Sequence, residues 1–256
     1  MDNLFSTGIR PTIDAHIEEE AKKLRDYGDY WSASSAGYCM RLNIMRRLGV
    51  PPVPEILESK PRVQRVFSAG HIFHDWIQGL TKEAGLSTHQ ELELIDDTIM
   101  VKGHCDDLVE IDGNKIVYDY KTVNSQSFKY KKDKISHYHR MQLGTYLYML
   151  RKEHKDLVES RVMNISKDDL RLSEFQLMWT PDLEKDVVSY WTTLNGYWKD
   201  KKLPKCTCAD YEGGFMFKRS SKGVVYNDYF YENEGCSLKW FELCKKQGLV
   251  PGLKNE

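Results

Sequence analysis

The stretch "TIMVKGHCDDLVEIDGNKIVYDYKTV", residues 98–123, decides the fold. Apolar, β-branched and aromatic residues fill it on both sides of the turn signal "DGN" at 112–114, which predicts two antiparallel strands joined by a short turn. Alternation along the second strand puts Asp119 and Lys121 on the same face. Opposite charges on one face of a buried strand indicate either an internal ion pair or a functional site.

The first strand of this pair adds a second carboxylate. It contains "GHCD", from Gly103 to Asp106, and pairing of the two strands would bring Asp106 towards Asp119. Two carboxylates in a partly buried site repel each other, and a divalent cation would remove that conflict. Cys105 is expected on the opposite face, as a thiol in the core.

The rest of the chain predicts helices around further strands. "HQELELI" at 89–95 alternates like a strand and extends the pair to an antiparallel meander. Two more strands are predicted at 160–166 and 171–180. Apolar residues at helical spacing, serine or proline at helix starts, and glycine at an end predict helices at 14–27, 32–49, 62–84, 137–153 and 181–202.

These elements predict an α/β fold, with a central mixed β-sheet flanked by helices and a cysteine-bearing C-terminal appendage. The 256 residues, 41% of them hydrophobic, are enough for one full core. We expect a single domain over 1–256, with a mainly helical part at 1–85, the sheet core at 86–180, and a helix with a Cys-rich tail at 181–256.

Charge and hydropathy limit the partners of the chain. The net charge of −1 gives no global attraction for nucleic acid, so DNA binding would depend on local patches such as "KYKKDK" at 129–134 and "KDKKLPK" at 199–205. The first twenty residues are acidic, and no apolar run approaches the roughly 18 residues that span a bilayer. We therefore expect a soluble, cytoplasmic protein without a membrane partner.

Two predicted helices flank the sheet with further polar side chains. The helix before it carries His71 and His74, which share a face, and the helix after it carries Gln142 and Tyr146 four residues apart. The chain thus presents, in order, a helix histidine, a strand aspartate, a strand Asp-x-Lys and a helix Gln-x-x-x-Tyr.

This ordered series resembles the PD-(D/E)xK nucleases, and among them the RecB-like exonucleases that include the CRISPR-associated iron-sulfur nucleases. The motifs that carry the resemblance are Gly70-x-x-x-His74, Gly103-x-x-Asp106, Asp119-x-Lys121 and Gln142-x-x-x-Tyr146. The resemblance implies a restriction-endonuclease-like core and a metal-dependent deoxyribonuclease.

The resemblance also implies a role for each motif residue. The ligands of Mg²⁺ or Mn²⁺ would be His74, Asp106, Asp119 and the backbone carbonyl of Tyr120, and an imidazole ligand favours Mn²⁺. Lys121 would orient or activate the attacking water and stabilise charge on the phosphate. Gln142 and Tyr146 would position the scissile strand or the lysine.

The six cysteines suggest a metal or buried thiols, because disulfides are rare inside cells. In the iron-sulfur relatives, one N-terminal cysteine and three C-terminal ones bind a [4Fe-4S] cluster. By that resemblance Cys39, Cys206, Cys208 and Cys244 would be the ligands, with Cys236 as substitute. A Zn²⁺ site of the four C-terminal cysteines is the alternative.

The expected substrate is DNA, preferably single-stranded, cleaved as an exonuclease from 5′ to 3′, with recombination or repair proteins as candidate partners. Lysines and aromatics mix in the segment 124–140, where Phe128, Tyr130, Tyr138 and His139 could stack on unpaired bases. Two alternatives stay open at this point. "HIFHDW" also suits an HD-type metal phosphohydrolase, which would be all-helical and would leave the Asp-x-Lys pair without a task. The other alternative is a non-catalytic DNA-binding protein with a structural metal cluster.

Overall fold

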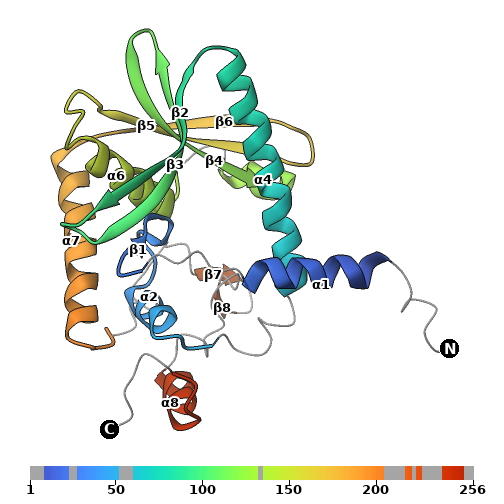
Figure 1. The fold of residues 1–256 in the computed structure, drawn as a ribbon, viewed down its shortest axis with the longest axis vertical. Helices are drawn as coiled ribbons and strands as arrows, with labels where there is room; N and C mark the ends of the chain where they lie inside the picture. Colours follow the sequence, from blue (N-terminus) through green and yellow to red (C-terminus); the bar gives the residue numbers. More distant parts are fainter. Residues whose placement is uncertain are drawn as a thin grey trace.

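The central sheet of the computed structural model is mixed, as predicted, and contains six strands (Figure 1). The structure describes residues 9–22, 28–51, 60–131, 135–204, 217–220, 223–226 and 238–250. The strands of the sheet are β1 (Trp31–Ser32), β2 (Ser87–Asp96), β3 (Val101–Ile111), β4 (Asn114–Val123), β5 (Glu159–Ser166) and β6 (Leu172–Met178). β2, β3 and β4 form the predicted antiparallel meander, β5 runs parallel to β4, and β6 is antiparallel to β5.

Strand β3 has different neighbours on its two edges. One edge pairs with β2 over residues 101–109. On the other edge, β1 runs parallel beside Val101 and Lys102, and β4 pairs with residues 107–111. Among the described strands, none forms ladder pairs with residues 103–106 on this second edge. The sheet therefore opens between β3 and β4 at the position of Asp106.

Helices cover the sheet and hold its ends. They are α1 (Ile9–Lys22), α2 (Met40–Arg47), α4 (Lys60–Glu83), α5 (Ser125–Lys131), α6 (His137–Leu150), α7 (Pro181–Lys199) and α8 (Leu238–Lys246). Hydroxyl side chains cap the starts of α6 and α7. The Ser136 hydroxyl accepts a hydrogen bond from the backbone N–H of His139, and the Thr180 hydroxyl accepts one from that of Leu183. These caps fix where α6 and α7 start against the sheet.

The segment 32–49 differs from its prediction as one serine-capped helix. A short 3₁₀ turn (Ala33–Ser35) precedes α2, which begins only at Met40. Gly37 separates the two with φ of +75°, and a Cβ there would approach the Met141 side chain to 2.9 Å. The left-handed backbone at Gly37 interrupts the helix that the composition of this segment favours.

The two faces of the sheet carry cores of unequal size. The larger core packs α2, α6 and α7 against one face, around residues such as Trp191, Leu147 and Val117. The smaller core packs Ile77 of α4 against Tyr118 and Tyr120 on the opposite face. Figure 1 shows α4 and α6 on different sides of the sheet. The gap between β3 and β4 thus lies between a helix from each layer.

Two further segments complete the described chain. The lysine-rich connection after β4, expected to be a loop, contains the short helix α5, while residues 132–134 lie outside the described part. In the C-terminal appendage, β7 (Phe217–Ser220) pairs with β8 (Gly223–Tyr226), and α8 buries Phe241 and Cys244 in the larger core. None of the described helices is long and apolar enough to cross a membrane.

Candidate active site

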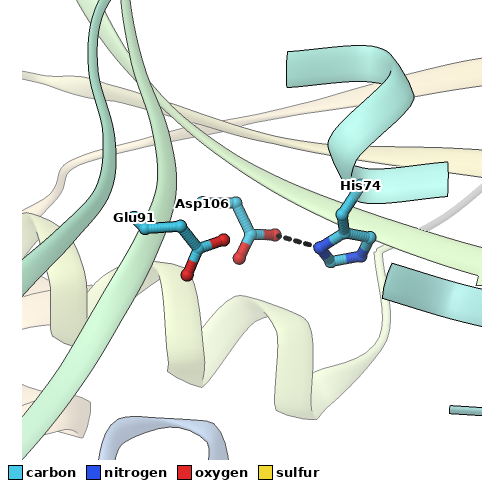
Figure 2. A group of neighbouring side chains, drawn as sticks. All are labelled: His74, Glu91 and Asp106. Carbon is cyan, nitrogen blue, oxygen red and sulfur yellow. Dashed lines mark ion pairs between the residues drawn. The ribbon is translucent and has the colours of Figure 1, made fainter. Parts of the chain in front are cut away.

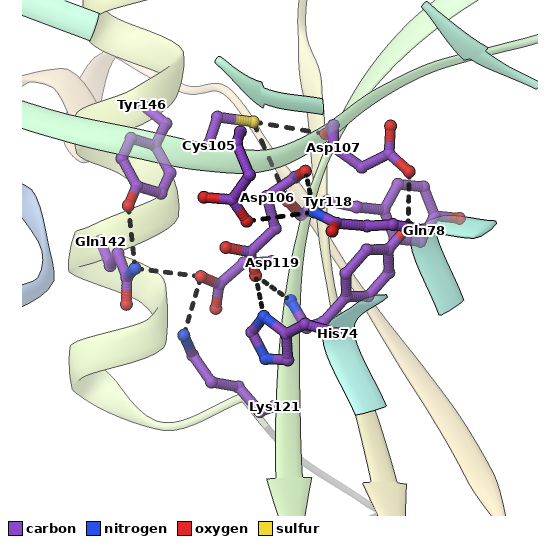
Figure 3. Close-up of polar contacts among 12 residues, drawn as sticks. His74, Gln78, Cys105, Asp106, Asp107, Tyr118, Asp119, Lys121, Gln142 and Tyr146 are labelled. Carbon is purple, nitrogen blue, oxygen red and sulfur yellow. Dashed lines mark hydrogen bonds and ion pairs between the residues drawn. The ribbon is translucent and has the colours of Figure 1, made fainter. Parts of the chain in front are cut away.

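Asp106 lies at the gap between the diverging strands. Its Oδ2 accepts a hydrogen bond of 2.6 Å from the backbone N–H of Tyr120. That N–H has no ladder partner on β3, because the pairing of β3 with β4 stops at Asp107 and Tyr118. The Asp106 carboxylate therefore takes the place of a backbone carbonyl and is held directly beside Asp119 on the next strand (Figure 3).

The carboxylate of Asp119 is completely buried and only half satisfied. Its Oδ1 accepts hydrogen bonds from Lys121 Nζ at 2.8 Å and from Gln142 Nε2 at 3.0 Å. Its Oδ2 is buried without a hydrogen-bond partner among the described residues. An unpaired buried carboxylate oxygen is costly, and a cation is the partner that relieves this cost best. Asp119 thus fits a metal ion on its Oδ2 side.

The pKa of Asp106 also indicates that the buried carboxylates need a cation. Burial and repulsion from Asp119 raise the pKa of Asp106 to about 8, although Lys121 and the Tyr120 N–H act in the opposite direction. A carboxyl group with such a pKa is mostly protonated at neutral pH. A divalent cation would displace this proton and stabilise both aspartates as anions.

Lys121 keeps its charge in this environment. Burial opposes the ammonium form, but Asp119 and Asp106 outweigh this effect and raise the pKa of Lys121. Its side chain is 27% exposed, whereas that of its partner Asp119 is inaccessible. The Lys121 side chain is therefore a positive charge that contacts a buried carboxylate and is itself partly exposed at the site.

His74 reaches the same carboxylates from α4. Its Nδ1 lies 3.7 Å from Asp106 Oδ2, which is an ion-pair distance only when the ring is protonated (Figure 2). Burial, together with the charge of Lys121, lowers the pKa of His74, so the ring is neutral at pH 7. A neutral imidazole has a lone pair to offer to a cation, whereas it makes only a weak contact with Asp106 itself.

Gln142 and Tyr146 of α6 support Asp119 from the larger core. Gln142 Nε2 donates to Asp119 Oδ1 and to the Tyr146 hydroxyl, both at 3.0 Å. Tyr146 is only 2% exposed and packs on Gly103, where a Cβ would come within 2.6 Å of the Ala33 Cβ and 3.1 Å of the Tyr146 ring. Glycine at 103 therefore lets the tyrosine approach β3. Both α6 side chains contact each other beside Asp119, and they are 7% and 2% exposed.

Sequence reasoning missed Glu91, which the structure brings to the same place. Ligand atoms of His74, Glu91 and Asp106 all lie within 4.8 Å of one another, a spacing that could hold a metal ion (Figure 2). The sequence offered only "QELEL", in which strict alternation puts Glu91 and Glu93 on one face. Glu93 instead pairs with Lys102 and His104, away from Asp106.

Strict alternation along β3 would put Cys105 and Asp107 on the same face, but the structure separates them. Cys105 is fully buried in the larger core, as expected of a core thiol. Asp107 points to the other layer, where its carboxylate accepts hydrogen bonds from the hydroxyls of Thr81, Ser87 and Tyr120 at 2.7, 2.6 and 3.0 Å. The alternation of β3 therefore changes phase at Asp106, which lies between them.

The candidate cluster ligands are only partly described. Cys39, at the N-cap of α2, and Cys244, on α8, are both buried. Cys206, Cys208 and Cys236 lie outside the described residues. The assignment of four cysteines to a cluster therefore stays a prediction.

The aromatics expected to stack on unpaired bases differ in their exposure. Phe128 is 4% exposed, with the Arg171 guanidinium 4.9 Å from its ring centroid. Tyr138 is 6% exposed and stacks on Tyr38 at a centroid distance of 4.3 Å. Only Tyr130, at 73%, is fully open to a ligand among these three. The expectation that Phe128 and Tyr138 stack on bases is not supported by their burial.

Comparisons with known proteins agree with the motif reading. The model of the PD-(D/E)XK nuclease superfamily matches residues 81–186, which contain Asp106, Asp119, Lys121, Gln142 and Tyr146. A comparison with curated proteins finds no match.

Three solved structures are similar at low sequence identity. SSO0001 is 19% identical, over 77% of this chain and 88% of its own, with a TM-score of 0.48. An alkaline exonuclease (LHK-Exo) from Laribacter hongkongensis is 12% identical, over 68% and 91%, with a TM-score of 0.44. A phage-related exonuclease from Haemophilus somnus 129PT is 11% identical, over 78% and 89%, with a TM-score of 0.34.

The family match covers strands β2 to β6, and the six-stranded mixed sheet excludes the all-helical fold of an HD-type phosphohydrolase. The segment 81–186, which includes strands β2 to β6, therefore matches the PD-(D/E)XK nuclease superfamily.

Proposed function

We propose that this protein is a divalent-metal-dependent deoxyribonuclease that uses the site at the gap between β3 and β4. The buried, unpartnered Oδ2 of Asp119 beside the crowded Asp106 carries this proposal. Both carboxylates stand next to a neutral imidazole and a charged lysine, and a protein that only binds DNA has no use for this arrangement.

The ligands of the cation are proposed to be His74, Asp106, Asp119 and the backbone carbonyl of Tyr120. Mg²⁺ and Mn²⁺ both suit carboxylate and carbonyl oxygens, and the imidazole favours Mn²⁺ in affinity. When bound, the cation would supply an activated water and a charge clamp on the phosphate.

The side chains around the ligands have separate tasks. Because the pKa of Lys121 is raised, its ammonium is charged at neutral pH and is suited to neutralising charge that develops on the phosphate. It is not poised to remove a proton from water in this state. Gln142 and Tyr146 are positioning residues, since they contact Asp119 and each other and are buried away from any substrate.

We further propose that the substrate is single-stranded DNA and that cleavage is exonucleolytic, from 5′ to 3′. The resemblance to RecB-like exonucleases supports this choice, and the exposed Tyr130 beside Lys129 on α5 offers a stacking ring next to a positive charge. By the same resemblance, Cys39, Cys206, Cys208 and Cys244 would hold a [4Fe-4S] cluster, with Zn²⁺ as the alternative. Iron, sulfide and zinc analysis of anaerobically purified protein distinguishes the two.

A cleavage time course tests the proposed function. Wild type, Asp119→Ala, Lys121→Ala and the control Asp112→Asn are incubated with 5′- or 3′-labelled single- and double-stranded DNA in Mg²⁺, Mn²⁺ or EDTA. Asp112 lies in the exposed β3–β4 turn with φ of +51°, which asparagine tolerates well, so this control changes a carboxylate outside the site. We expect metal-dependent cleavage by wild type and control and none by the two site variants. Retained cleavage in both site variants would overturn the assignment.

A further inference from the structure

In β2 and β3, the alternation of side chains between the two faces of the sheet changes phase at one pair of opposed residues. On one side of this point, Leu92 and Cys105 pack in the larger core. On the other side, Gln90 donates to the Gln78 carbonyl and Asp107 accepts from Thr81, so both turn towards α4. The register continues unbroken from Leu92↔Cys105 to Gln90↔Asp107. Glu91 and Asp106 stand opposite each other where the faces change.

The backbone of Glu91 makes this exchange possible. Its φ is +48°, in the left-handed region that non-glycine residues rarely adopt. Turned in this way, its side chain leaves the plane of alternation and lies beside Asp106, facing His74 (Figure 2). Glycine or asparagine would adopt this backbone conformation with less strain than glutamate does. The presence of glutamate here therefore indicates that its carboxylate has a function, such as binding a ligand.

The charge of Lys121 compensates that of Asp106 only in part. Within the described residues, neither lysine nor arginine forms an ion pair with Glu91 or Asp106. Glu91 adds to the repulsion that raises the pKa of Asp106. The buried Asp119, with its unpartnered Oδ2, adds a third carboxylate on the far side of Asp106 (Figure 3).

Gln78 holds this arrangement in place. Its Nε2 donates to Glu91 Oε1 at 3.1 Å and to the backbone carbonyl of Asp106 at 2.7 Å. Gln78 is 7% exposed and follows His74 by one helical turn on α4. One buried amide therefore fixes both acidic residues relative to the histidine, as the outer partners of metal ligands commonly do.

We propose that Glu91 is a metal ligand, and that Glu91, His74 and Asp106 together bind a divalent cation. The proposal rests on the proposed function, because it adds a ligand to the same site. Two carboxylates and one neutral imidazole form a donor set for Mn²⁺, with Mg²⁺ bound more weakly.

Binding of Mn²⁺ alone, without DNA, tests the proposal. Calorimetry and electron paramagnetic resonance are compared for wild type, Glu91→Gln, Glu91→Gly and the matched control Glu93→Gln on the same strand. Both Glu91 variants should weaken Mn²⁺ binding at least tenfold or lose a bound ion, whereas Glu93→Gln should bind as wild type does. Unchanged Mn²⁺ binding in Glu91→Gln would overturn the proposal.

The glycine variant separates loss of a ligand from loss of the fold. Glycine accepts φ of +48° without strain, so metal-free Glu91→Gly should unfold at the same temperature as wild type or higher. Weaker Mn²⁺ binding in a protein of undiminished Tm can then be ascribed to the missing carboxylate.

Failure of this proposal is distinct from failure of the proposed function. If Asp119→Ala loses DNA cleavage while Glu91→Gln binds Mn²⁺ like wild type, only the role of Glu91 is wrong. If Asp119→Ala cleaves DNA like wild type, the nuclease site is wrong, whatever Glu91 binds.

Discussion

Asp107 receives hydrogen bonds from three hydroxyl groups, whereas Asp106, its neighbour in the chain, receives one backbone N–H and stands beside a second aspartate. Both side chains belong to β3, but they point to different layers of the molecule. Neutral donors satisfy Asp107 completely, so it needs no cation. Asp106 keeps a charge conflict that a protein used only as a scaffold would not retain. The comparison teaches that the number of donors around a buried carboxylate, and not its burial, separates a structural aspartate from a candidate ligand.

The largest expected effect is on DNA cleavage. Asp106→Asn should reduce the cleavage rate by about 10³-fold, because the amide cannot replace an anionic ligand at the cation. Asp107→Asn should keep the rate within about tenfold of wild type, since it acts only through the placement of Tyr120. Rates are normalised to the folded fraction measured by circular dichroism. Equal losses in the two variants would show that the two aspartates do not differ in role.

Stability should show the opposite order. Asp107→Asn should lower the free energy of unfolding by about 2–3 kcal/mol, because the amide leaves hydroxyl donors in a buried site without acceptors. Asp106→Asn should cause no such loss, because at pH 6 the Asp106 carboxyl group is already protonated and neutral, and an amide oxygen can still accept the hydrogen bond from the Tyr120 N–H. Urea unfolding of both variants in EDTA at pH 6 measures the difference. A stable Asp107→Asn protein would mean that the three hydroxyls reorganise around the amide.

A further effect should appear in the pH dependence of the metal-free protein. The pKa of Asp106 is raised from 3.8 to about 8 by folding, so the folded state binds its proton more tightly than the unfolded state does. The contribution of Asp106 to stability therefore falls as the pH rises from 4 to 8. The stability of Asp106→Asn relative to wild type should grow over this range, by at most about 1.4 kcal/mol per pH unit.

Urea unfolding at pH 5, 6, 7 and 8 measures this difference. Saturating Mg²⁺ or Mn²⁺ should reverse it, because only wild type gains stability from a cation at Asp106. A stability difference that is constant from pH 5 to pH 8 in EDTA would contradict the crowding of Asp106 by Asp119.

The sequence predicted those parts of the site whose geometry depends on residues close together in the chain. The turn at 112–114 and the alternation of β3 and β4 placed Asp106 near Asp119, and the spacing of Gln142 and Tyr146 placed both on one side of α6. In each case neighbours in the chain, or in one hairpin, determine the geometry. The prediction therefore needed no knowledge of how distant segments pack.

Other parts depend on packing that a single sequence does not contain. At Glu91 and Asp106 the side chains stop alternating between the two faces of the sheet, and prediction of strands from sequence assumes that they alternate. This change depends on contacts with α4 on one face and with α6 on the other, which a single sequence does not reveal. Phe128 and Tyr138 looked like stacking rings beside lysines, yet Arg171 and Tyr38 cover them. A residue type indicates what a side chain can do, while its neighbours in the fold decide whether it is accessible.

The parallel pairing of β4 with β5 has a consequence for synthesis of the chain. β4 pairs with β3 only as far as Tyr118, so residues 119–123 have a strand neighbour on one edge alone, and that neighbour is β5. β5 leaves the ribosome only after α6 has been made. Until then, residues 119–123 have two open edges among the described strands, and open edges recruit strands from other molecules. Nascent or truncated chains that end before β5 should therefore aggregate through the segment that bears Asp119 and Lys121.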